Sequence, residues 1–303
     1  MRRRRPATAI GTKTMITVDA PIESAVVRRL TILPRGGSAR IALAASIIIA
    51  GLAVIALCAP LLAPHDPTQG DLSNALAGSS AQHLLGTDQN GRDILSRLIY
   101  GGRTALLGPL GVTLLATAIG LPLGLLAGHV GSVVDSVVSR VWDVLLAFPT
   151  TVLGILLVAA IGPGYTGAII AMAIAYVPLM GRMVRGATIV ERQKPYVDAC
   201  RVQGFSTARI LFRHVLPAIT PLVVAQATLN FGYSLLDLAG LAYLGLGVQP
   251  PTADWGQMLN TGQGGLVLGA SSEMASAAIA ILVAVVSVNL LGDALVNRAE
   301  ASR

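Results

Sequence analysis

The sequence has 303 residues, of which 53% are hydrophobic and only 12% are charged, and its mean hydropathy is +0.70. A soluble domain carries roughly 25% charged residues, so the composition excludes an ordinary soluble protein and indicates a polytopic membrane protein. The net charge of +7 says little about partners until the basic residues are placed along the chain. The two cysteines, Cys58 and Cys200, show neither a redox nor a zinc spacing and are not expected to pair.

Residues 1–40 form a basic tail of mixed polarity. The arginines at positions 2–5 are followed by PATAIGTKTMITVDAPIES, which lacks the apolar run that a signal peptide places directly after its basic residues. We therefore expect a cytoplasmic tail, with an arm that binds the membrane surface as the alternative.

Six apolar stretches are long enough to cross a hydrocarbon core of about 30 Å. The predicted spans cover residues 41–62, 106–127, 141–161, 167–183, 218–241 and 274–291. In the second span the spacing of Gly120, Gly124 and Gly128 predicts a face that a neighbouring helix can approach closely. Pro149 falls within the third span, and Gly162-Pro163-Gly164 predicts a tight turn after it.

A polar external segment follows the first span and contains DQNGRD at residues 88–93. Its Asn90-Gly91 pair predicts a tight turn, and Asp93 is placed to cap the helix that leads into the second span. The same letters resemble the start of a calcium loop. Because Arg92 stands where an acidic ligand would help, the turn is favoured.

A second polar segment, residues 196–217, separates the fourth and fifth spans and reads YVDACRVQGFSTARILFRHVLP. Gly204 is typical of a residue that ends a helix in the left-handed conformation. Ser206 is placed to cap a second helix, which we expect to run to Leu216 and to end at Pro217. This helix–glycine–helix pattern predicts a compact surface that can contact a binding partner outside the membrane.

The basic residues are distributed unevenly among the predicted loops. Of the 22 lysines and arginines, only Arg92, Arg97 and Arg103 fall in the segments on one side of the membrane. Because cytoplasmic loops carry an excess of lysine and arginine, we expect both termini and the polar segment 196–217 to face the cytoplasm.

The sequence offers no recognisable catalytic constellation. Its four histidines lie in predicted loops or at span edges, at positions His65, His83, His129 and His214. It contains neither a Cys/His spacing typical of a metal site nor the phosphate-binding motif G-x-x-x-x-G-K-[ST]. We therefore expect no catalytic residue, no metal site and no nucleotide bound by this chain.

Asp237 is the one acidic residue well inside a predicted span. Carriers driven by ion gradients usually place several ionisable residues in their spans, so the energy for any uphill transport is expected to come from another subunit. Asp237 is expected either to bond a neighbouring side chain, Asn230 or Tyr233, or to line a transport pathway. These three residues are the candidate pathway residues.

The polar segment 196–217 resembles the signature E-A-A-x-x-x-G-x(9)-I-x-L-P of binding-protein-dependent ABC importer permeases. Here the signature reads Asp198-Ala199-Cys200, then Gly204, His214 at the isoleucine position, and Leu216-Pro217. Aspartate thus replaces glutamate and cysteine replaces alanine. The stretches HLLGTDQNGRDILSRLIYGGRTALL, DVLLAFP and LAYLGLGVQPPTADWGQML are similar to the C-type subunit of the dipeptide, oligopeptide and nickel branch.

The resemblance implies an all-α membrane protein with six transmembrane helices, cytoplasmic N- and C-termini and the type I ABC importer transmembrane fold. It divides the chain into a cytoplasmic tail (1–40), a first transmembrane helix with an external segment (41–100), a type-1 transmembrane domain (101–294) and a second tail (295–303). In that family the polar segment 196–217 forms coupling helices that dock on a cytoplasmic ATPase. The residues it assigns to coupling here are Tyr196, Asp198, Ala199, Cys200, Gly204, Arg209, Leu216 and Pro217.

The implied partners are a second, homologous permease subunit, two cytoplasmic ATPases that bind ATP and Mg²⁺, an external substrate-binding protein and the lipid of a bacterial inner membrane. The chain itself is expected to hold no cofactor and no nucleic acid. The implied function is to form half of the pathway of an ATP-driven importer of di- or oligopeptides. Nickel chelates or another small solute are the alternative cargo, and an ion-coupled secondary transporter is the alternative from another class.

Overall fold

The computed structural model describes the backbone of residues 35–301 and the side chains of residues 40–298. Most of the expected basic tail therefore lies outside the described residues. The chain divides after Ser38 into two units, and the description below concerns the second unit, which runs from Ala39 to the C-terminus.

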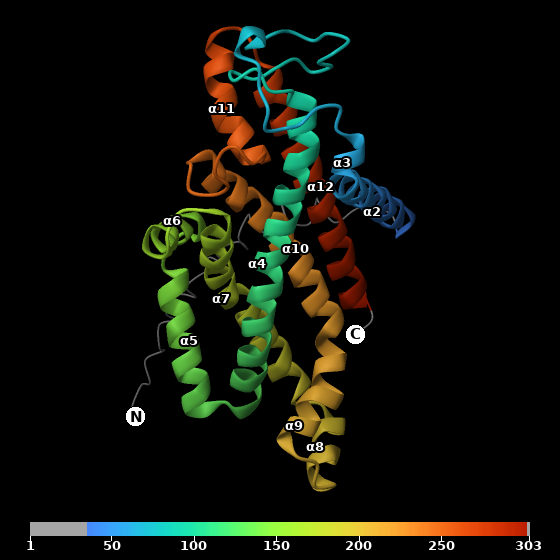
Figure 1. The fold of residues 1–303 in the computed structure, drawn as a ribbon. Coiled ribbons are helices and arrows are strands. Elements are labelled where there is room, and N and C mark those ends of the chain that lie inside the picture. Colours follow the sequence, from blue (N-terminus) through green and yellow to red (C-terminus); the bar gives the residue numbers. More distant parts are fainter. Residues whose placement is uncertain (1–34, 302–303) are drawn as a thin grey trace, which may run out of the picture. The chain divides into compact units, whose positions relative to one another are not determined.

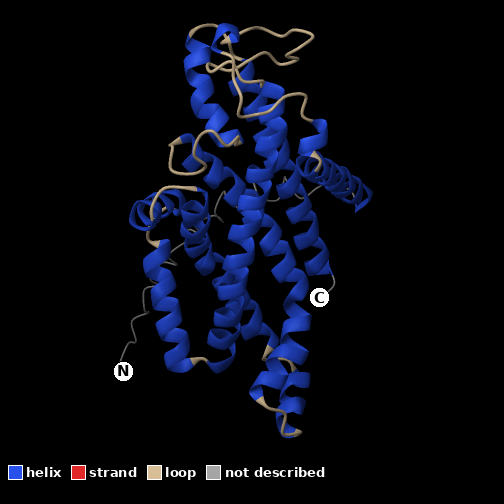
Figure 2. Ribbon diagram, in the orientation of Figure 1, coloured by secondary structure: helices blue, strands red, loops and turns tan. Residues whose placement is uncertain are grey.

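The described part of the chain is helical, and its only β pairing is an isolated bridge between Thr87 and Asp93 (Figures 1 and 2). In chain order the α-helices are α2 (Arg35–Leu57), α3 (Ala59–Leu62), α4 (Ile94–Val130), α5 (Ser132–Leu146), α6 (Thr150–Ile161), α7 (Tyr165–Glu191), α8 (Pro195–Val202), α9 (Thr207–Ile210), α10 (Leu216–Tyr243), α11 (Trp255–Val267) and α12 (Ser272–Ala301). A short 3-10 turn, η1 (Leu72–Asn74), lies between α3 and α4, and a π-helical turn, η2 (Leu211–Val215), joins α9 to α10.

Five stretches of helix in the described residues are long and apolar enough to cross a membrane, and a bent pair, α5 with α6, would make a sixth. The predicted third span, residues 141–161, is not one continuous helix, because α5 and α6 meet there at an angle of 93°. Pro149 is the N-cap of α6 rather than a residue inside a helix. A proline disfavours helical geometry in the residue before it, so the chain turns there.

The glycine face of α4 packs against α7, as its spacing predicts. A Cβ atom added to Gly120 would lie 2.9 Å from the carbonyl oxygen of Val177, and one added to Gly124 would lie 2.6 Å from that of Gly181. At Gly128 the added atom would lie 2.7 Å from the Cβ atom of Thr188. Any side chain at these positions would push the two backbones apart.

Residues 132–140, which fall between the second and third predicted spans, are helical in α5. Trp142 of this helix is buried against Gly181 of α7. The guanidinium of Arg185 donates to the Asp135 carboxylate, with Nη2 2.7 Å from Oδ2. The buried ring and two ion pairs to α7, Arg185–Asp135 and Arg182–Asp143, thus hold α5 in place. The exposed side of this helix is rich in valines.

Hydrogen bonds from two arginines hold the external segment between α3 and α4 in place. Arg92 Nε donates to Asp88 Oδ2 over 2.7 Å, and the turn at Asn90-Gly91 forms as predicted, with φ of +71° at Gly91. Arg97 is fully buried and donates to the carbonyl of Pro67 over 3.2 Å. Because Arg92 supplies the positive charge beside Asp88, this loop is a turn and not a calcium site.

Candidate functional site

The polar segment 196–217 lies at one end of the long helices, and the external segment with α11 lies at the other (Figure 1). This placement agrees with the opposite sides of the membrane that the basic residues predict. The segment comprises most of α8, then α9, η2 and the first residues of α10.

Gly204 ends α8 in the way the sequence predicts. Its φ is +77°, the left-handed region that glycine adopts without strain. Two backbone hydrogen bonds close the helix, from the Gly204 amide to the Arg201 carbonyl (3.0 Å) and from the Phe205 amide to the Cys200 carbonyl (3.1 Å). These are the two bonds of a Schellman motif. No atom lies within 4 Å of an added Cβ, so backbone conformation, and not crowding, requires glycine here.

Ser206 caps the second helix, since its Oγ accepts from the Arg209 amide over 3.3 Å. The expected end of that helix at Pro217 is wrong. From Thr207 to Tyr243 the helical conformation continues without a break. Proline lacks an amide hydrogen and its ring crowds the carbonyl four residues earlier. The π-helical turn η2, which widens the helix just before Pro217, relieves that conflict.

The two short helices have one face in the interior and one face outside. Val197 and Ile210 pack into a core cluster with Met180 and Val184 of α7. Cys200 belongs to the same cluster and is only 8% exposed. Its small side chain therefore seats α8 against this chain's own core, whereas a partner could touch the outward face.

The outward face carries most of the remaining residues that the resemblance assigns to coupling. Asp198, Ala199, Gly204, Arg209 and Pro217 are exposed, and Leu216 is half-buried. Val202, which the sequence reasoning did not single out, is 89% exposed at the end of α8. The sequence could not have identified this residue, because a valine two residues before Gly204 does not reveal that its side chain is exposed.

Tyr196 and Arg209 are both held by neighbours within the chain. The Tyr196 hydroxyl donates to the Glu191 carboxylate over 2.8 Å. Burial and this hydrogen bond raise the pKa of Tyr196 above its ordinary value. The Arg209 guanidinium lies 4.1 Å from the centre of the Phe205 ring, a cation–π contact that orients the arginine across the turn at Gly204.

Asp237 is bonded by two helices other than its own. The hydroxyls of Thr151 in α6 and Tyr176 in α7 each donate to one carboxylate oxygen, both over 2.8 Å. The expected partners, Asn230 and Tyr233, were wrong. The correct ones could not be recognised because they lie 86 and 61 residues away in the sequence.

The other two candidate pathway residues occupy different surroundings. Asn230 is fully buried, and its Oδ1 accepts from Gln226 over 2.9 Å. Tyr233 is 51% exposed. Of the three candidates, therefore, Tyr233 is the one whose side chain is largely open to the outside of this chain.

Comparison with known proteins gives consistent results along the sequence. Residues 120–302 match the model of the family described as binding-protein-dependent transport system inner membrane component. Residues 38–79 match the N-terminal transmembrane domain of oligopeptide transport permease C.

Three curated relatives illustrate the range of named substrates. The dipeptide transport system permease of Alkalihalophilus pseudofirmus is 40% identical over 84% of this chain and 84% of its own. The nickel transport system permease of Escherichia coli K12 is 40% identical over 85% of this chain and 92% of its own. The glutathione transport system permease of Pectobacterium atrosepticum is 38% identical over 84% of this chain and 85% of its own.

Among solved structures, a chain of the MetNI methionine ABC transporter in an inward-facing conformation has the same fold. The TM-score is 0.56 at 20% identity, and the match covers 68% of this chain and 97% of the other.

Proposed function

Because the chain belongs to the binding-protein-dependent transport system inner membrane components, the permeases of ABC importers, we propose that its polar segment 196–217 is the coupling segment through which ATPase subunits drive transport. The chain is a multi-pass inner-membrane permease and not itself an ATPase, and permeases of this family work with ATPase subunits and a binding protein. We further propose six spans with cytoplasmic termini, a second permease that completes the pathway, and two ATPases.

The observation that carries this proposal is the continuity of helix from the coupling segment into the core. Helical structure runs from Thr207 to Tyr243 without a loop, and α10 packs against α4, α7, α11 and α12. A force applied to α8 and α9 therefore reaches the membrane-spanning helices through rigid structure.

In the mechanism we propose, ATP shifts a balance between two arrangements of the spans. The ATPases close on ATP, move the coupling segments, and favour the arrangement that accepts substrate from the binding protein. After hydrolysis the inward-open arrangement returns. Such a shift requires that ATP-bound and ATP-free partners differ in affinity for the two arrangements.

Gly204→Leu tests the coupling proposal. A side chain in the left-handed conformation costs about 1–2 kcal/mol, which corresponds to roughly a 5- to 30-fold change in a docking equilibrium. We expect uptake and co-purification of the ATPases to fall together by about that factor, while the amount of permease in the membrane stays unchanged.

Two variants control this experiment. Gly204→Asn should retain more activity than Gly204→Leu, because asparagine tolerates the left-handed conformation better. Gly186→Leu adds the same side chain to an exposed helical glycine of α7 with open space around it, and it should transport normally. Normal uptake by Gly204→Leu, with its ATPases still bound, would contradict the proposal that residues 196–217 couple the ATPases to transport.

For the cargo we propose di- or oligopeptides. Relatives at 38–40% identity are named for dipeptides, glutathione and nickel, and glutathione, like a dipeptide, is a peptide. The decisive measurement is to isolate the cognate binding protein and identify its bound ligand by mass spectrometry. A nickel chelate in place of a peptide would contradict this part of the proposal without affecting the coupling segment.

A further inference from the structure

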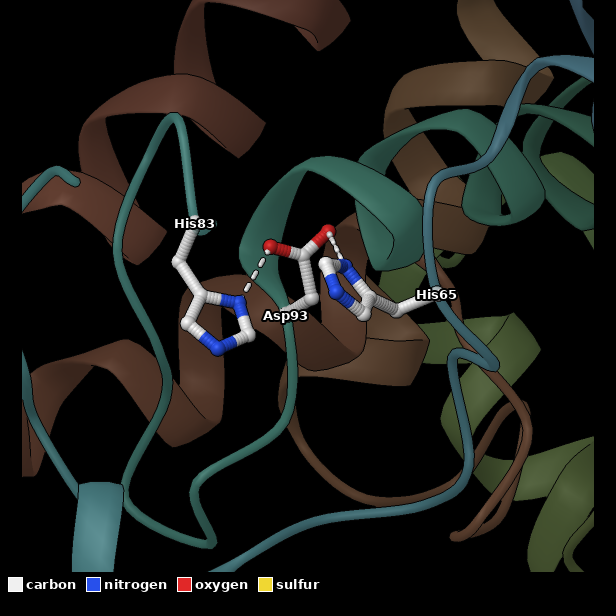
Figure 3. A group of neighbouring side chains, drawn as sticks. All are labelled: His65, His83 and Asp93. Carbon is white, nitrogen blue, oxygen red and sulfur yellow. Dashed lines mark hydrogen bonds and ion pairs between the residues drawn. The ribbon is translucent and has the colours of Figure 1, made fainter. Parts of the chain in front are cut away.

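Three residues that are well separated in the sequence meet at the start of α4, in the external segment. Figure 3 shows His83 and His65 on either side of the Asp93 carboxylate, with one ring nitrogen of each directed toward it. One possible ligand atom from each residue lies within 4.8 Å of the other two. We propose that His65, His83 and Asp93 form a binding site for a divalent transition-metal ion such as Zn²⁺.

The distances suit a small ion with nitrogen and oxygen ligands. His83 Nδ1 lies 3.0 Å from Asp93 Oδ1, and His65 Nδ1 lies 3.8 Å from Asp93 Oδ2. Ligand atoms bonded to tetrahedral zinc at about 2.0–2.1 Å lie roughly 3.3 Å from one another. The two separations from the carboxylate bracket that value, whereas the three ligand atoms spread over as much as 4.8 Å, so the histidines must approach each other to bind one ion.

The hydrogen bonds around the cluster position the carboxylate and one histidine. Asp93 is the N-cap of α4, and its Oδ2 accepts from the amide and the hydroxyl of Ser96 over 2.8 and 2.7 Å. The same Ser96 hydroxyl accepts from the His65 amide over 3.0 Å. Supporting bonds of this kind orient metal ligands and tune their affinity.

Burial and charge also favour an ion here. The Asp93 side chain is fully buried and His83 is 19% exposed, whereas His65 is 42% exposed and leaves one side open to solvent. The nearby arginines do not neutralise Asp93, since Arg92 and Arg97 direct their Nε atoms to Asp88 over 2.7 and 3.4 Å. Imidazole and carboxylate ligands together suit zinc, nickel or copper better than magnesium or calcium.

His83 Nδ1 lies within hydrogen-bond distance of Asp93 Oδ1. On binding, the ion replaces that hydrogen bond, and the His83 proton resides on Nε2. The ion would then tie the chain after α3, the loop around His83 and the N-terminus of α4 into one unit. The site rests on the external segment alone and does not depend on the proposed coupling segment.

Metal titration of the full chain tests the site. The protein is purified in detergent without a polyhistidine tag, stripped with EDTA and titrated with Zn²⁺ by calorimetry. Co²⁺ serves as a second probe, because its absorption spectrum reports tetrahedral coordination. We expect one ion per chain and a rise in the thermal unfolding midpoint when Zn²⁺ is added, because only the folded chain assembles the ligands.

The matched variants are His65→Ala and His129→Ala. Loss of the His65 ligand should weaken Zn²⁺ binding by about tenfold or more and reduce the thermal shift at a given Zn²⁺ concentration. His129, at the far end of α4, should be replaceable without effect. His65→Gln serves if the alanine variant does not fold. Absence of one-to-one binding in the wild-type chain, or binding by a folded His65 variant equal to wild type, would overturn the proposal.

Discussion

Asp237 is held at the junction of three helices by two hydroxyl donors. Tyr176 is only 2% exposed, so solvent water cannot readily replace the Asp237 carboxylate as the acceptor of its hydroxyl hydrogen bond. This arrangement favours a structural role for Asp237, in which the side chain joins α10 to α6 and α7. A role in the pathway would instead require the carboxylate to meet the cargo.

Replacing Asp237 distinguishes these two roles. Asp237→Ala leaves two hydroxyls without an acceptor, and each buried unsatisfied group costs about 1–3 kcal/mol. We expect a clear fall in the thermal unfolding midpoint in detergent, and a smaller fall for Asp237→Asn, which keeps one acceptor oxygen. Asp293→Ala, at an exposed carboxylate of α12, is the control. An unchanged midpoint with an altered KM for cargo would contradict the structural role.

Among the elements, α11 is a helix that lies between the fifth and sixth predicted spans, and one residue anchors its start. The Asp254 carboxylate accepts from the amides of Gly256 and Gln257 over 2.9 and 3.2 Å. Trp255 Nε1 donates to the Leu98 carbonyl of α4 over 2.8 Å. Because Asp254 is only 5% exposed, burial raises the pKa of its carboxyl group despite the capping bonds.

This raised pKa predicts a pH dependence with a definite sign. An acid that binds its proton more tightly in the folded state makes stability fall as pH rises from its ordinary pKa of 3.8 through the raised folded pKa. Asp254→Asn keeps a capping oxygen and removes the buried charge. We expect its thermal midpoint, relative to wild type, to rise as pH increases from about 4 to 7.

Asp71→Asn provides a control of opposite sign. Asp71 is exposed, and hydrogen bonds from Ser73 lower its pKa, so the wild-type carboxylate stabilises the chain above its ordinary pKa and loses that effect as pH falls. A difference between wild type and Asp254→Asn that does not change with pH would contradict the assignment to Asp254. Asp254→Ala, which removes the cap as well as the charge, should be about 0.5–2 kcal/mol less stable than Asp254→Asn at either pH.

At the scale of the whole molecule, the two ends carry different surfaces. The end with α8 and α9 exposes Val202 beside basic residues, and the end with α11 exposes Val267 and Leu268. If the coupling segment docks on the ATPases, these subunits cover Val202 in the assembled importer. They do not reach Val267, which lies at the opposite end.

Charge substitutions at the two ends test this assignment. Val202→Asp should weaken co-purification of the ATPases, because burying an unpaired carboxylate in an interface is unfavourable, and it should leave the permease folded since the residue is 89% exposed. Val267→Asp, at a residue 86% exposed, should leave ATPase binding unchanged. Equal ATPase recovery with wild type and Val202→Asp would argue against docking at this surface.

Features that depend on a few neighbouring residues were predictable from the sequence. The left-handed Gly204, the Ser206 cap, the turn at Asn90-Gly91 and the cap at Asp93 all formed as expected. Their bonds link residues within a few positions, so local chemistry decides them. The apolar spans and the close-packing glycines of α4 follow likewise from composition and helical periodicity.

Features that depend on distant residues were decided by the tertiary structure. Nothing near Asp237 in the sequence identifies Thr151 and Tyr176, and nothing in the spacing of His65, His83 and Asp93 indicates that they meet. Proline at position 217 did not end its helix, because packing of η2 and α10 into the core offsets its local cost. The sequence by itself thus determined the turns, the family and the spans other than the bent third one. Only the folding of the chain decided which side chains face one another, since those contacts join residues from separate helices.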